Sequence, residues 1–505
     1  MKKKNLSQKV VMTVTSLGQK GRYHMKKTIY FILSSLLLFL LLTACGKETE
    51  EIQDNSEKIQ NVPQEDQQEI SQEDRQEVII AAVAVSEDDF FLSNLEEFIQ
   101  QFNKSQSKYI VRLETTLVEH SSTIIAVTGD DYADAVQKLK IDLVTGVGGY
   151  DLLWLDGSTF QQIDVQGLLK AGTLEDLGSW LDKKDGLERD DFFKMILDAY
   201  TLDGTIFALP AEVQVSCLSG NSDLLGDRTE WTLREFLDFA AEYPDMKIHN
   251  CWFPGLAAIT LVQEGNISFV EKNENGQLIF DDKLLRDLIE YAKNGPFRQG
   301  EFGIKLANIS LSTAQEYRYL DPAPKTFIGF PSQDRQNRCT VENRLSLSIC
   351  SNSDCKEGAW AFLEYYLLHS EDNRNTENRF YTNTNTYPAV KEVFEKIMAE
   401  HLYFQYIRDE NGEILLDEQG DPQLRSTTVD NNGYVYPPIT EEDVAFVRDF
   451  LLSSRGAHLQ LFTTNQICVI LSEECLPYFM DEKPLDEVVK IIKGRMISFY
   501  QEQDL

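Results

Sequence analysis

The residue types that most often carry catalysis are scattered along this sequence. It contains no His-x-x-x-His or His-Glu-x-x-His spacing, which would place two zinc ligands on one helix face. It also lacks a Gly-x-Ser-x-Gly nucleophile elbow and a phosphate-binding loop of the Walker type. The histidines are widely separated: His24, His120, His249, His369, His401 and His458. The sequence therefore predicts a protein that works without a metal or a cofactor and is not an enzyme.

Carboxylates keep one enzymatic alternative open. The chain has 82 Asp and Glu residues against 48 Lys and Arg residues, and its formal net charge is −34. A glycoside hydrolase needs two suitably placed carboxyl groups, and any acidic chain offers many candidates. The same charge argues against binding nucleic acid or anionic lipid, while it would favour a cationic ligand. It also keeps an exported protein soluble.

Two segments resemble ligand-binding loops in composition but not in context or spacing. Gly146-Val147-Gly148-Gly149 precedes a predicted strand at 151–155, whereas a dinucleotide fingerprint follows a strand, so we expect a turn there. The acidic residues between 409 and 421 faintly resemble a calcium loop, but their spacing does not fit a helix–loop–helix. Two solvated turns on either side of Ile414-Leu415-Leu416 are the expected structure.

Cys45 has the position of a modified residue. An apolar run at 29–42 follows two lysines and is shorter than the roughly 20 residues of a membrane-spanning helix. The run ends in Leu42-Thr43-Ala44-Cys45, which resembles the bacterial lipobox, in which the cysteine is acylated before cleavage. A positive region, an apolar core and a small-residue cut site form a secretory signal peptide. A plain signal peptide or an uncleaved anchor that ends in cysteine by chance is the alternative.

These features divide the N-terminal region. We predict residues 1–24 as an over-assigned extension before Met25, and residues 25–44 as the signal peptide. Residues 46–77 contain eleven acids and three bases with few apolar residues, a composition that cannot form a packed core. Residues 45–77 are therefore expected to be a lipidated cysteine and a disordered acidic linker, extended by its like charges.

The remaining seven cysteines are odd in number and show no paired metal-binding spacing. We expect buried thiols, with Cys339 and Cys350 as possible partners across two strands.

Strands alternate with helices at the start of the folded region. Residues 77–84 form a short apolar, branched run, and residues 109–113 and 151–155 form two more. Between them, residues 92–103 carry an apolar stripe at helical spacing, and residues 133–143 are again helical. This alternation predicts βαβ units and a mainly parallel sheet, with binding groups in the loops at the carboxyl ends of the strands.

The order of these segments and of later ones resembles the extracellular solute-binding proteins of family 1, the maltose-binding-protein-like receptors of ABC importers. The resemblance covers roughly 420 residues and depends on the order of short sequence segments, each of which is common by itself. They include Tyr150-Asp151-Leu152-Leu153-Trp154-Leu155-Asp156, Asp203-Gly204-Thr205-Ile206-Phe207-Ala208-Leu209-Pro210, Glu230-Trp231-Thr232-Leu233-Arg234-Glu235-Phe236, Ile328-Gly329-Phe330-Pro331-Ser332 and Tyr387-Pro388-Ala389-Val390-Lys391. The chain departs from the family at Asp481, where a glycine is frequent, and in the acidic insert at 409–430.

The resemblance implies an α/β, two-lobed periplasmic-binding-protein-like fold of type II. Each lobe would be a mainly parallel sheet flanked by helices, and a hinge at 209–213 would let the lobes close on a ligand. Lobe 1 would comprise residues 78–210 and 326–370, and lobe 2 residues 211–325 and 371–505.

The resemblance also implies a ligand site between the lobes. Carbohydrates have apolar faces and hydroxyl edges, so their sites combine aromatic rings with carboxylates and amides. The expected ligand-binding residues are Asp156, Ser158, Glu212, Gln214, Trp252, Tyr434 and Tyr436. Helix capping and salt bridging are alternative roles for the carboxylates. Trp154, Trp231 and Trp360 are expected in the core.

The function that follows is capture of a solute, most simply a carbohydrate or oligosaccharide, outside the cell and delivery to an ABC permease. We expect a monomer, lipid-anchored on the extracellular face of a Gram-positive-type cell membrane. The alternatives are a binding protein for a non-sugar solute such as a polyamine, a lipid-anchored surface glycan hydrolase, and a sensor subunit.

Overall fold

The computed structural model describes residues 75–503, except 86–89, 119–128, 184–185, 244–246, 250–253, 295–302, 320–323, 334, 336–338, 370–384, 426–436 and 454–455. All described residues belong to one compact unit, residues 70–505. The predicted signal peptide, Cys45 and nearly all of the linker lie outside the described residues. Among the helices that are described, none combines the length and the apolar character needed to cross a membrane.

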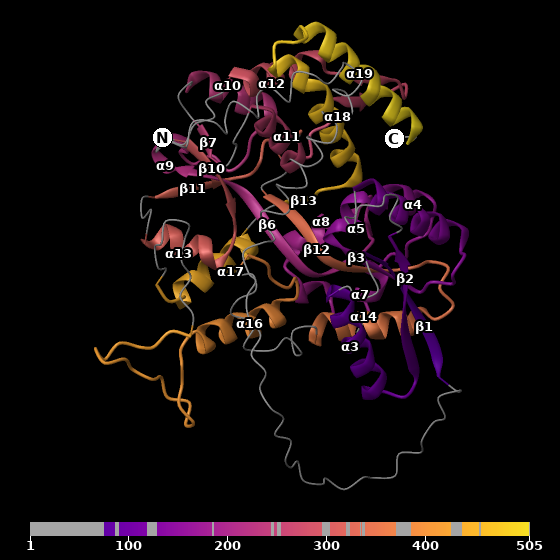
Figure 1. The fold of residues 1–505 in the computed structure, drawn as a ribbon, viewed down its shortest axis with the longest axis vertical. Helices are drawn as coiled ribbons and strands as arrows, with labels where there is room; N and C mark the ends of the chain where they lie inside the picture. Colours follow the sequence, from indigo (N-terminus) through magenta and orange to yellow (C-terminus); the bar gives the residue numbers. More distant parts are fainter. Residues whose placement is uncertain are drawn as a thin grey trace, which may run out of the picture. The chain divides into compact units, whose positions relative to one another are not determined.

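The described chain begins with the predicted alternation of strands and helices (Figure 1). The elements are β1 (Gln76–Ala84), α3 (Phe90–Ser105), β2 (Tyr109–Leu117), α4 (Gly129–Thr145) and β3 (Leu152–Asp156). β1 pairs in parallel with β2 on one side and with β3 on the other. Its last five residues are buried, as expected for an inner parallel strand that is covered on both faces. β1 starts at Gln76, so the last two residues of the predicted linker belong to the sheet.

Helix α3 packs on this sheet through the predicted apolar stripe. Leu95, Phe98 and Phe102 are all buried. The helix is fixed to β2 by Asn103, whose side-chain amide donates to the carbonyl of Val111 and accepts from its N–H group, each at 2.8 Å. One polar side chain therefore replaces a backbone partner for both groups of Val111 and sets where the helix ends relative to the strand.

Several short elements lead from β3 to the longest strand of the sheet. They are α5 (Gly157–Gln162), α6 (Val165–Lys170), α7 (Gly178–Leu181), the 3₁₀ helix η2 (Arg189–Asp191), α8 (Lys194–Ala199), β4 (Thr201–Leu202), β5 (Thr205–Ile206) and β6 (Leu209–Asn221). β6 pairs antiparallel with β12 (Cys339–Ile349), which in turn pairs antiparallel with β3. The nine-stranded sheet has the order β2-β1-β3-β12-β6-β10-β7, with β11 paired to β6 and β13 to β12. β6 and β12 thus run through its middle.

The elements between β6 and β12 build a second packed region around the far end of β6. They are α9 (Ser222–Leu225), α10 (Leu233–Glu242), β7 (Lys247–His249), α11 (Pro254–Gly265), β8 (Val270–Lys272), β9 (Leu278–Phe280), α12 (Asp282–Asn294), β10 (Gly303–Asn308), α13 (Leu311–Tyr319) and β11 (Lys325–Ile328). Among the described elements, β10 and β11 pair antiparallel with β6, and β7 pairs in parallel with β10.

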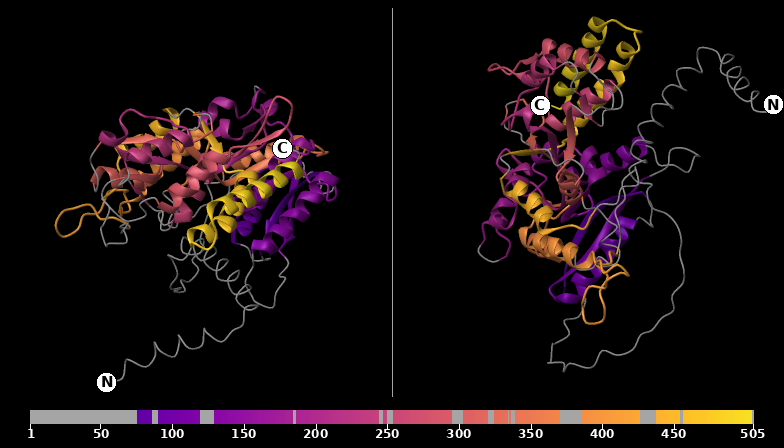
Figure 2. Two further views of the ribbon diagram at one scale, coloured as in Figure 1. Left: turned by 90° about the horizontal axis from the view of Figure 1, so that it is seen from above. Right: turned by 90° about the vertical axis from the view of Figure 1, so that its left-hand side faces the viewer.

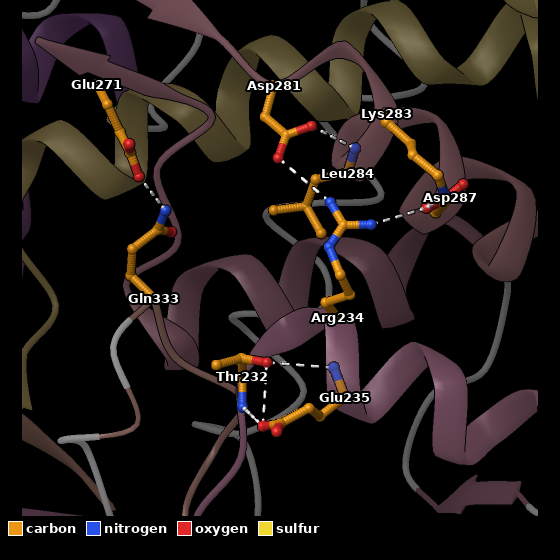
Figure 3. Close-up of polar contacts among 9 residues, drawn as sticks. All are labelled: Thr232, Arg234, Glu235, Glu271, Asp281, Lys283, Leu284, Asp287 and Gln333. Atoms are coloured by element: carbon orange, nitrogen blue, oxygen red, sulfur yellow. Dashed lines mark hydrogen bonds and ion pairs between the residues drawn. The ribbon is translucent and has the colours of Figure 1, made fainter. Parts of the chain in front are cut away.

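Helix α10 shows how the sequence fixes a helix start in this region (Figure 3). Thr232 is its N-cap and accepts from the N–H group of Glu235, while the Glu235 carboxylate accepts from the N–H group of Thr232 at 2.9 Å. This reciprocal capping box satisfies two backbone donors that a helix otherwise leaves unpaired. Arg234, on the same turn, reaches Asp281 at 3.3 Å and Asp287 at 3.5 Å, which connects α10 to α12.

The C-terminal part returns to both regions. It comprises α14 (Lys356–His369), α16 (Lys391–Phe404), α17 (Glu441–Ser453), β13 (Ala457–Leu459), α18 (Phe462–Phe479) and α19 (Leu485–Glu502). α14 packs against α3, where the Phe362 ring meets the Phe102 ring at 5.3 Å between centroids. α18 and α19 lie beside α11 and α12, as Figures 1 and 2 show.

The apolar residues form two separate cores, and the α/β fold class with two lobes is confirmed. The first core contains buried residues of β1, β3, α14 and α16, and the second contains those of α10, α11, α12, α18 and α19. The exact lobe boundaries stay a prediction. The buried described residues between Tyr387 and Leu461 pack into the first core, although the predicted boundary assigned residues 371–505 to lobe 2.

The three tryptophans expected in the core, Trp154, Trp231 and Trp360, are buried. The two cysteines named as a possible pair are buried, as expected for core thiols, and do not bond to each other. Cys339 begins β12 and Cys350 follows its last residue, so the length of one strand separates them and both side chains are buried.

The acidic insert forms the two expected turns. Asp409 accepts from the N–H groups of Asn411 and Glu413, and Asp417 accepts in the same way from Gln419 and Asp421, all at 2.8–2.9 Å. This segment extends away from α16 and α17 as the orange loop of Figure 2.

Candidate functional site

A row of polar side chains lies on one face of β6 and β12, the two paired strands in the middle of the sheet. Along β6, Glu212, Gln214 and Ser216 alternate with Val213 and Val215, which are fully buried. Because side chains of a strand alternate between its two faces, the valines point into the core and the polar residues point to the opposite face.

The register extends this row onto β12. Glu342 lies opposite Gln214, and Thr340 lies opposite Ser216. Directly opposite residues of an antiparallel pair share a face, so two carboxylates, an amide and two hydroxyls gather over the middle of the sheet. We take this polar face as the floor of the candidate site.

Two compensating irregularities interrupt the pairing at one end of the floor. Asn343 pairs with Val213 and Leu345 with Glu212, which leaves Arg344 as an extra residue on β12. The next pair joins Ser346 to Pro210, so the register is restored by an extra residue on β6. Bulges of this kind bend strands and re-aim side chains, and they are frequent beside binding sites.

The bulge directs Arg344 onto the floor. Its guanidinium donates to the side-chain oxygen of Gln214 at 2.7 Å and lies 3.4 Å from the carboxylate of Glu342. Arg344 occupies the side-chain oxygen of Gln214, and no acceptor among the described residues pairs with the Gln214 NH₂ group, so this group can donate to a ligand. The floor therefore combines hydrogen-bond donors and acceptors, which a hydroxyl-rich solute requires.

The predicted residues of β6 lie next to the predicted residue of β3. Glu212 and Asp156 both pair with Leu345, from opposite sides of β12. Asp156 is also the N-cap of α5, where its carboxylate accepts from the N–H group of Thr159 at 2.7 Å, and Glu212 accepts from the hydroxyl of Thr386. Capping is thus an observed role of Asp156. Ser158 lies exposed in the first turn of α5.

The structure therefore brings together Asp156, Glu212 and Gln214, with Ser158 in the adjacent helix. Trp252, Tyr434 and Tyr436 lie outside the described residues, and their place in a site stays a prediction. Sequence reasoning missed Thr340, Glu342 and Arg344. The available signal was the alternation Thr-Val-Glu-Asn-Arg at 340–344, which mirrors the Glu-Val-Gln-Val-Ser of β6.

Glu264, at the end of α11, closes the other end of the floor. Its carboxylate accepts from the amide of Gln460 at 2.9 Å and from the hydroxyl of Ser216 at 3.4 Å, while Thr340 donates to its backbone carbonyl at 2.6 Å. The residue is partly buried, and its carboxyl group lies beside Ser216 and Gln460. Burial, together with the negative charge of Glu342, raises the pKa of Glu264 to about 7.

Glu342 is affected in the same direction. Burial raises its pKa, and the neighbouring Arg344 guanidinium opposes the change. The floor thus contains two carboxyl groups that hold their protons more tightly than in water. Among the described residues, no three His, Cys, Asp and Glu side chains are grouped closely enough to hold a metal ion.

Comparison with known proteins gives the class of this site. Residues 98–401 match the family model of the bacterial extracellular solute-binding proteins. Because the match spans more than half of the 505 residues, the chain belongs to this family, as the sequence resemblance predicted. No curated protein sequence is significantly similar to the chain.

Solved structures of similar fold include three solute-binding proteins. A family 1 protein from Alicyclobacillus acidocaldarius is 11% identical, with 85% of this chain and 99% of that chain covered and a TM-score of 0.46. A Listeria monocytogenes ABC substrate-binding protein in complex with cycloalternan is 15% identical, with coverages of 86% and 100% and a TM-score of 0.42. A sugar-binding protein from Xanthomonas citri is 14% identical, with coverages of 85% and 98% and a TM-score of 0.44. At these values the ligands of those proteins are not assigned to this chain.

Proposed function

We propose that this chain is the substrate-binding component of an ABC importer, and that its ligand is a carbohydrate or oligosaccharide. Family membership supports capture of a solute outside the cell. The observation that carries the proposal further is the polar floor on β6 and β12, beside the point where β6 passes from the first core to the second. Paired donors and acceptors on such a floor suit the hydroxyl groups of a sugar.

The proposed mechanism is closure of two lobes about the floor, without making or breaking a bond. The bulge on β6 falls within residues 209–213, the predicted hinge, and irregular pairing there makes bending less costly than in a regular ladder. A solute that contacts both lobes binds the closed arrangement better and shifts the population toward it. Asp156, Ser158, Glu212 and Gln214 would contact the ligand, with Trp252, Tyr434 and Tyr436 proposed as aromatic partners.

The proposed setting is the outer face of the cell membrane. Acylation of Cys45 would hold the protein there, and the acidic linker at 46–75 would let the folded part reach a permease. An extracellular family supports this location. The permease is the proposed recipient of the solute.

A thermal-shift screen tests the function. The chain from Gly46 would be heated with panels of neutral oligosaccharides, polyamines and peptides. A ligand at a hundred times its dissociation constant should add about 2.7 kcal/mol of stability. Stabilisation by an oligosaccharide that is recovered unchanged supports the proposal. Stabilisation by a polyamine alone contradicts the carbohydrate assignment, and cleavage of the sugar identifies a hydrolase.

A further inference from the structure

Glu264 lies where both lobes meet the connecting strands. Its helix, α11, belongs to the second core through Ala258, Leu261 and Val262. Yet its carboxyl group contacts Ser216, at the point where β6 passes from one core to the other. The group is therefore placed to respond when the second lobe moves relative to the strands.

The environment of this carboxyl group is polar but offers no full positive charge of its own. Among the described residues, its hydrogen-bond donors are neutral hydroxyls and the Gln460 amide. The charged neighbour from β12 is Glu342, whose own partner is Arg344. An ionised Glu264 would thus face another carboxylate in a poorly hydrated place.

Two more titratable groups face this region from other elements. His458 of β13 lies opposite Thr340 in the parallel ladder and is buried. Cys468 of α18 has a pKa raised to about 12 by burial and by the charge of Glu264. A thiol of this kind does not ionise near neutral pH, so His458 is the competing origin of a pH effect.

A chain of amides connects Glu264 to the contact between the lobes. Gln460 donates to Glu264 and accepts from Gln263 at 3.3 Å, and Gln263 also donates to Asn465 at 3.3 Å. Asn465, near the start of α18, donates to the backbone carbonyl of Gln161 in α5 at 3.0 Å.

This last bond crosses from the second core to the first, because α18 packs in the second core and α5 in the first. A second bond accompanies it, from the hydroxyl of Thr463 to the side-chain oxygen of Gln166 at 2.9 Å. Figure 1 shows α5 close to the lower end of α18. The bond from Asn465 to Gln161 is thus connected, through Gln263 and Gln460, to the carboxyl group of Glu264.

We propose that the protonation of Glu264 controls the contact between α18 and α5, and so makes the closure of the lobes sensitive to pH. A protonated Glu264 is compatible with the enclosed position and with the ordered amide chain. An ionised Glu264 beside Glu342 requires water, which it gains when Gln460 and α18 withdraw from the strands.

The direction follows from linkage. The contacted arrangement holds the proton with a pKa of about 7, whereas a hydrated Glu264 would return toward its ordinary value of 4.5. Protons therefore favour the arrangement that binds them more tightly. The contact should strengthen as the pH falls from about 7 toward 4.5 and weaken as the pH rises. This proposal concerns the ligand-free protein and does not depend on which solute binds.

Energy transfer between dyes on the two lobes tests the proposal in the chain from Cys45 to its end, without ligand. An azide-bearing phenylalanine would replace the exposed Ile141 of α4 and Ile279 of β9, which leaves the native cysteines untouched. The transfer efficiency would be titrated from pH 5.5 to 8.5, with far-UV circular dichroism to show that each variant stays folded. The protein with native Glu264 should give a change in transfer efficiency that is centred between pH 4.5 and about 7, because the two arrangements have pKa values near these limits.

Three variants separate the origins of that change. Glu264→Gln should remove the transition. Glu342→Gln should move its midpoint to lower pH, because the charge of Glu342 raises the pKa of Glu264. His458→Gln should leave the transition in place. An unchanging efficiency in the parent protein, a transition that survives Glu264→Gln, or one that disappears only in His458→Gln would overturn the proposal. If Glu264→Gln does not fold, the direction of the shift in Glu342→Gln decides.

Discussion

At the scale of single residues, the candidate site depends on the alternation of polar and apolar side chains along β6. Glu212 and Gln214 face the floor because Val213 and Val215 fill the core on the other side of β6. Moving the pairing by one residue would exchange the two sets, so the buried valines fix the direction of the polar side chains. The same register places Glu342 of β12 beside Gln214.

Removing the polar groups of β6 should weaken ligand binding by different amounts. Gln214→Ala deletes a neutral hydrogen bond and should cost about 1 kcal/mol, whereas Glu212→Ala deletes a charged acceptor and should cost about 2 kcal/mol. Titration calorimetry with the solute found by the screen measures both. Glu274→Ala, in the exposed turn between β8 and β9, is the matched control. Unchanged dissociation constants for both floor variants would show that the ligand binds elsewhere.

Part of the site could be predicted from the sequence, and the reason for the rest is physical. Glu212 follows Pro210 in a segment where apolar and polar residues alternate, and this pattern predicts a strand with one face in the core and one face outside it. Glu264 ends an otherwise apolar helix, and nothing in its local sequence says that it packs beside Ser216. Arg344 is aimed by a bulge, and a bulge depends on the pairing of two strands that are distant in sequence.

At the scale of elements, helix ends are where single side chains have clear energetic effects. Helix α10 starts with a complete capping box. Helix α18 ends at Phe479, with Met480 as its C-cap, and the next residue, Asp481, has φ +57°. The resemblance to the family 1 proteins implies that glycine is frequent at the position of Asp481. The positive φ explains that preference, since a side chain in this conformation crowds the backbone.

The capping box makes a measurable contribution. Thr232→Ala removes the acceptor for the Glu235 N–H group and should destabilise the protein by about 1 kcal/mol. Thr232→Ser keeps the acceptor and should stay close to the parent protein. Urea unfolding followed by circular dichroism compares the three. An alanine variant as stable as the serine variant would show that α10 does not depend on this cap.

Asp481 gives a second comparison of two variants. Its carboxylate lies 2.5 Å from the ammonium of Lys293, so both Asp481→Gly and Asp481→Ala lose the same ion pair. Only alanine keeps a side chain at positive φ, and the glycine variant should therefore be the more stable of the two by about 1 kcal/mol. Their melting temperatures measure the difference. Equal values would mean that the backbone relaxes out of this conformation.

The order of the elements was more predictable than their pairing. Apolar runs and helical stripes identified β1, α3, β2, α4 and β3, because each signal lies within one segment. The insertion of β12 between β3 and β6 joins segments far apart in the chain, and local periodicity carries no information on such partners. The return of residues 387–461 to the first core escaped prediction for the same reason.

At the scale of the whole molecule, two apolar cores share one continuous sheet. Glu342 on β12 and Glu264 at the end of α11 have raised pKa values, so the stability of the protein is coupled to pH at the same place as its proposed closure.

This coupling predicts how unfolding depends on pH. The folded chain binds the proton of Glu264 with a pKa of about 7, against 4.5 for an ordinary glutamate. Its contribution to stability is fully present below about pH 4.5 and is lost as the pH rises through about 7. The difference in urea midpoint between the parent protein and Glu264→Gln should therefore move in favour of the variant from pH 5 to pH 8. A difference that stays constant over this range would contradict the raised pKa, and Glu274→Gln is the control that should show no such trend.

The last prediction concerns where the molecule is held. If Cys45 is the acylated residue, Cys45→Ser should prevent both acylation and the anchoring that follows from it. The variant should move from the membrane pellet to the soluble fraction of a bacterial host, whereas the parent protein sediments with membranes. Cys355→Ser is the matched control, because Cys355 is the described free cysteine that is not buried and its loss leaves the N-terminal region intact. Mass spectrometry of the N-terminal peptide should find diacylglycerol on the parent protein alone. A Cys45→Ser protein that still sediments and keeps residues 25–44 would instead identify the apolar run as an uncleaved anchor. A Cys45→Ser protein that is cleaved and released would show that the lipid is needed for attachment to the membrane.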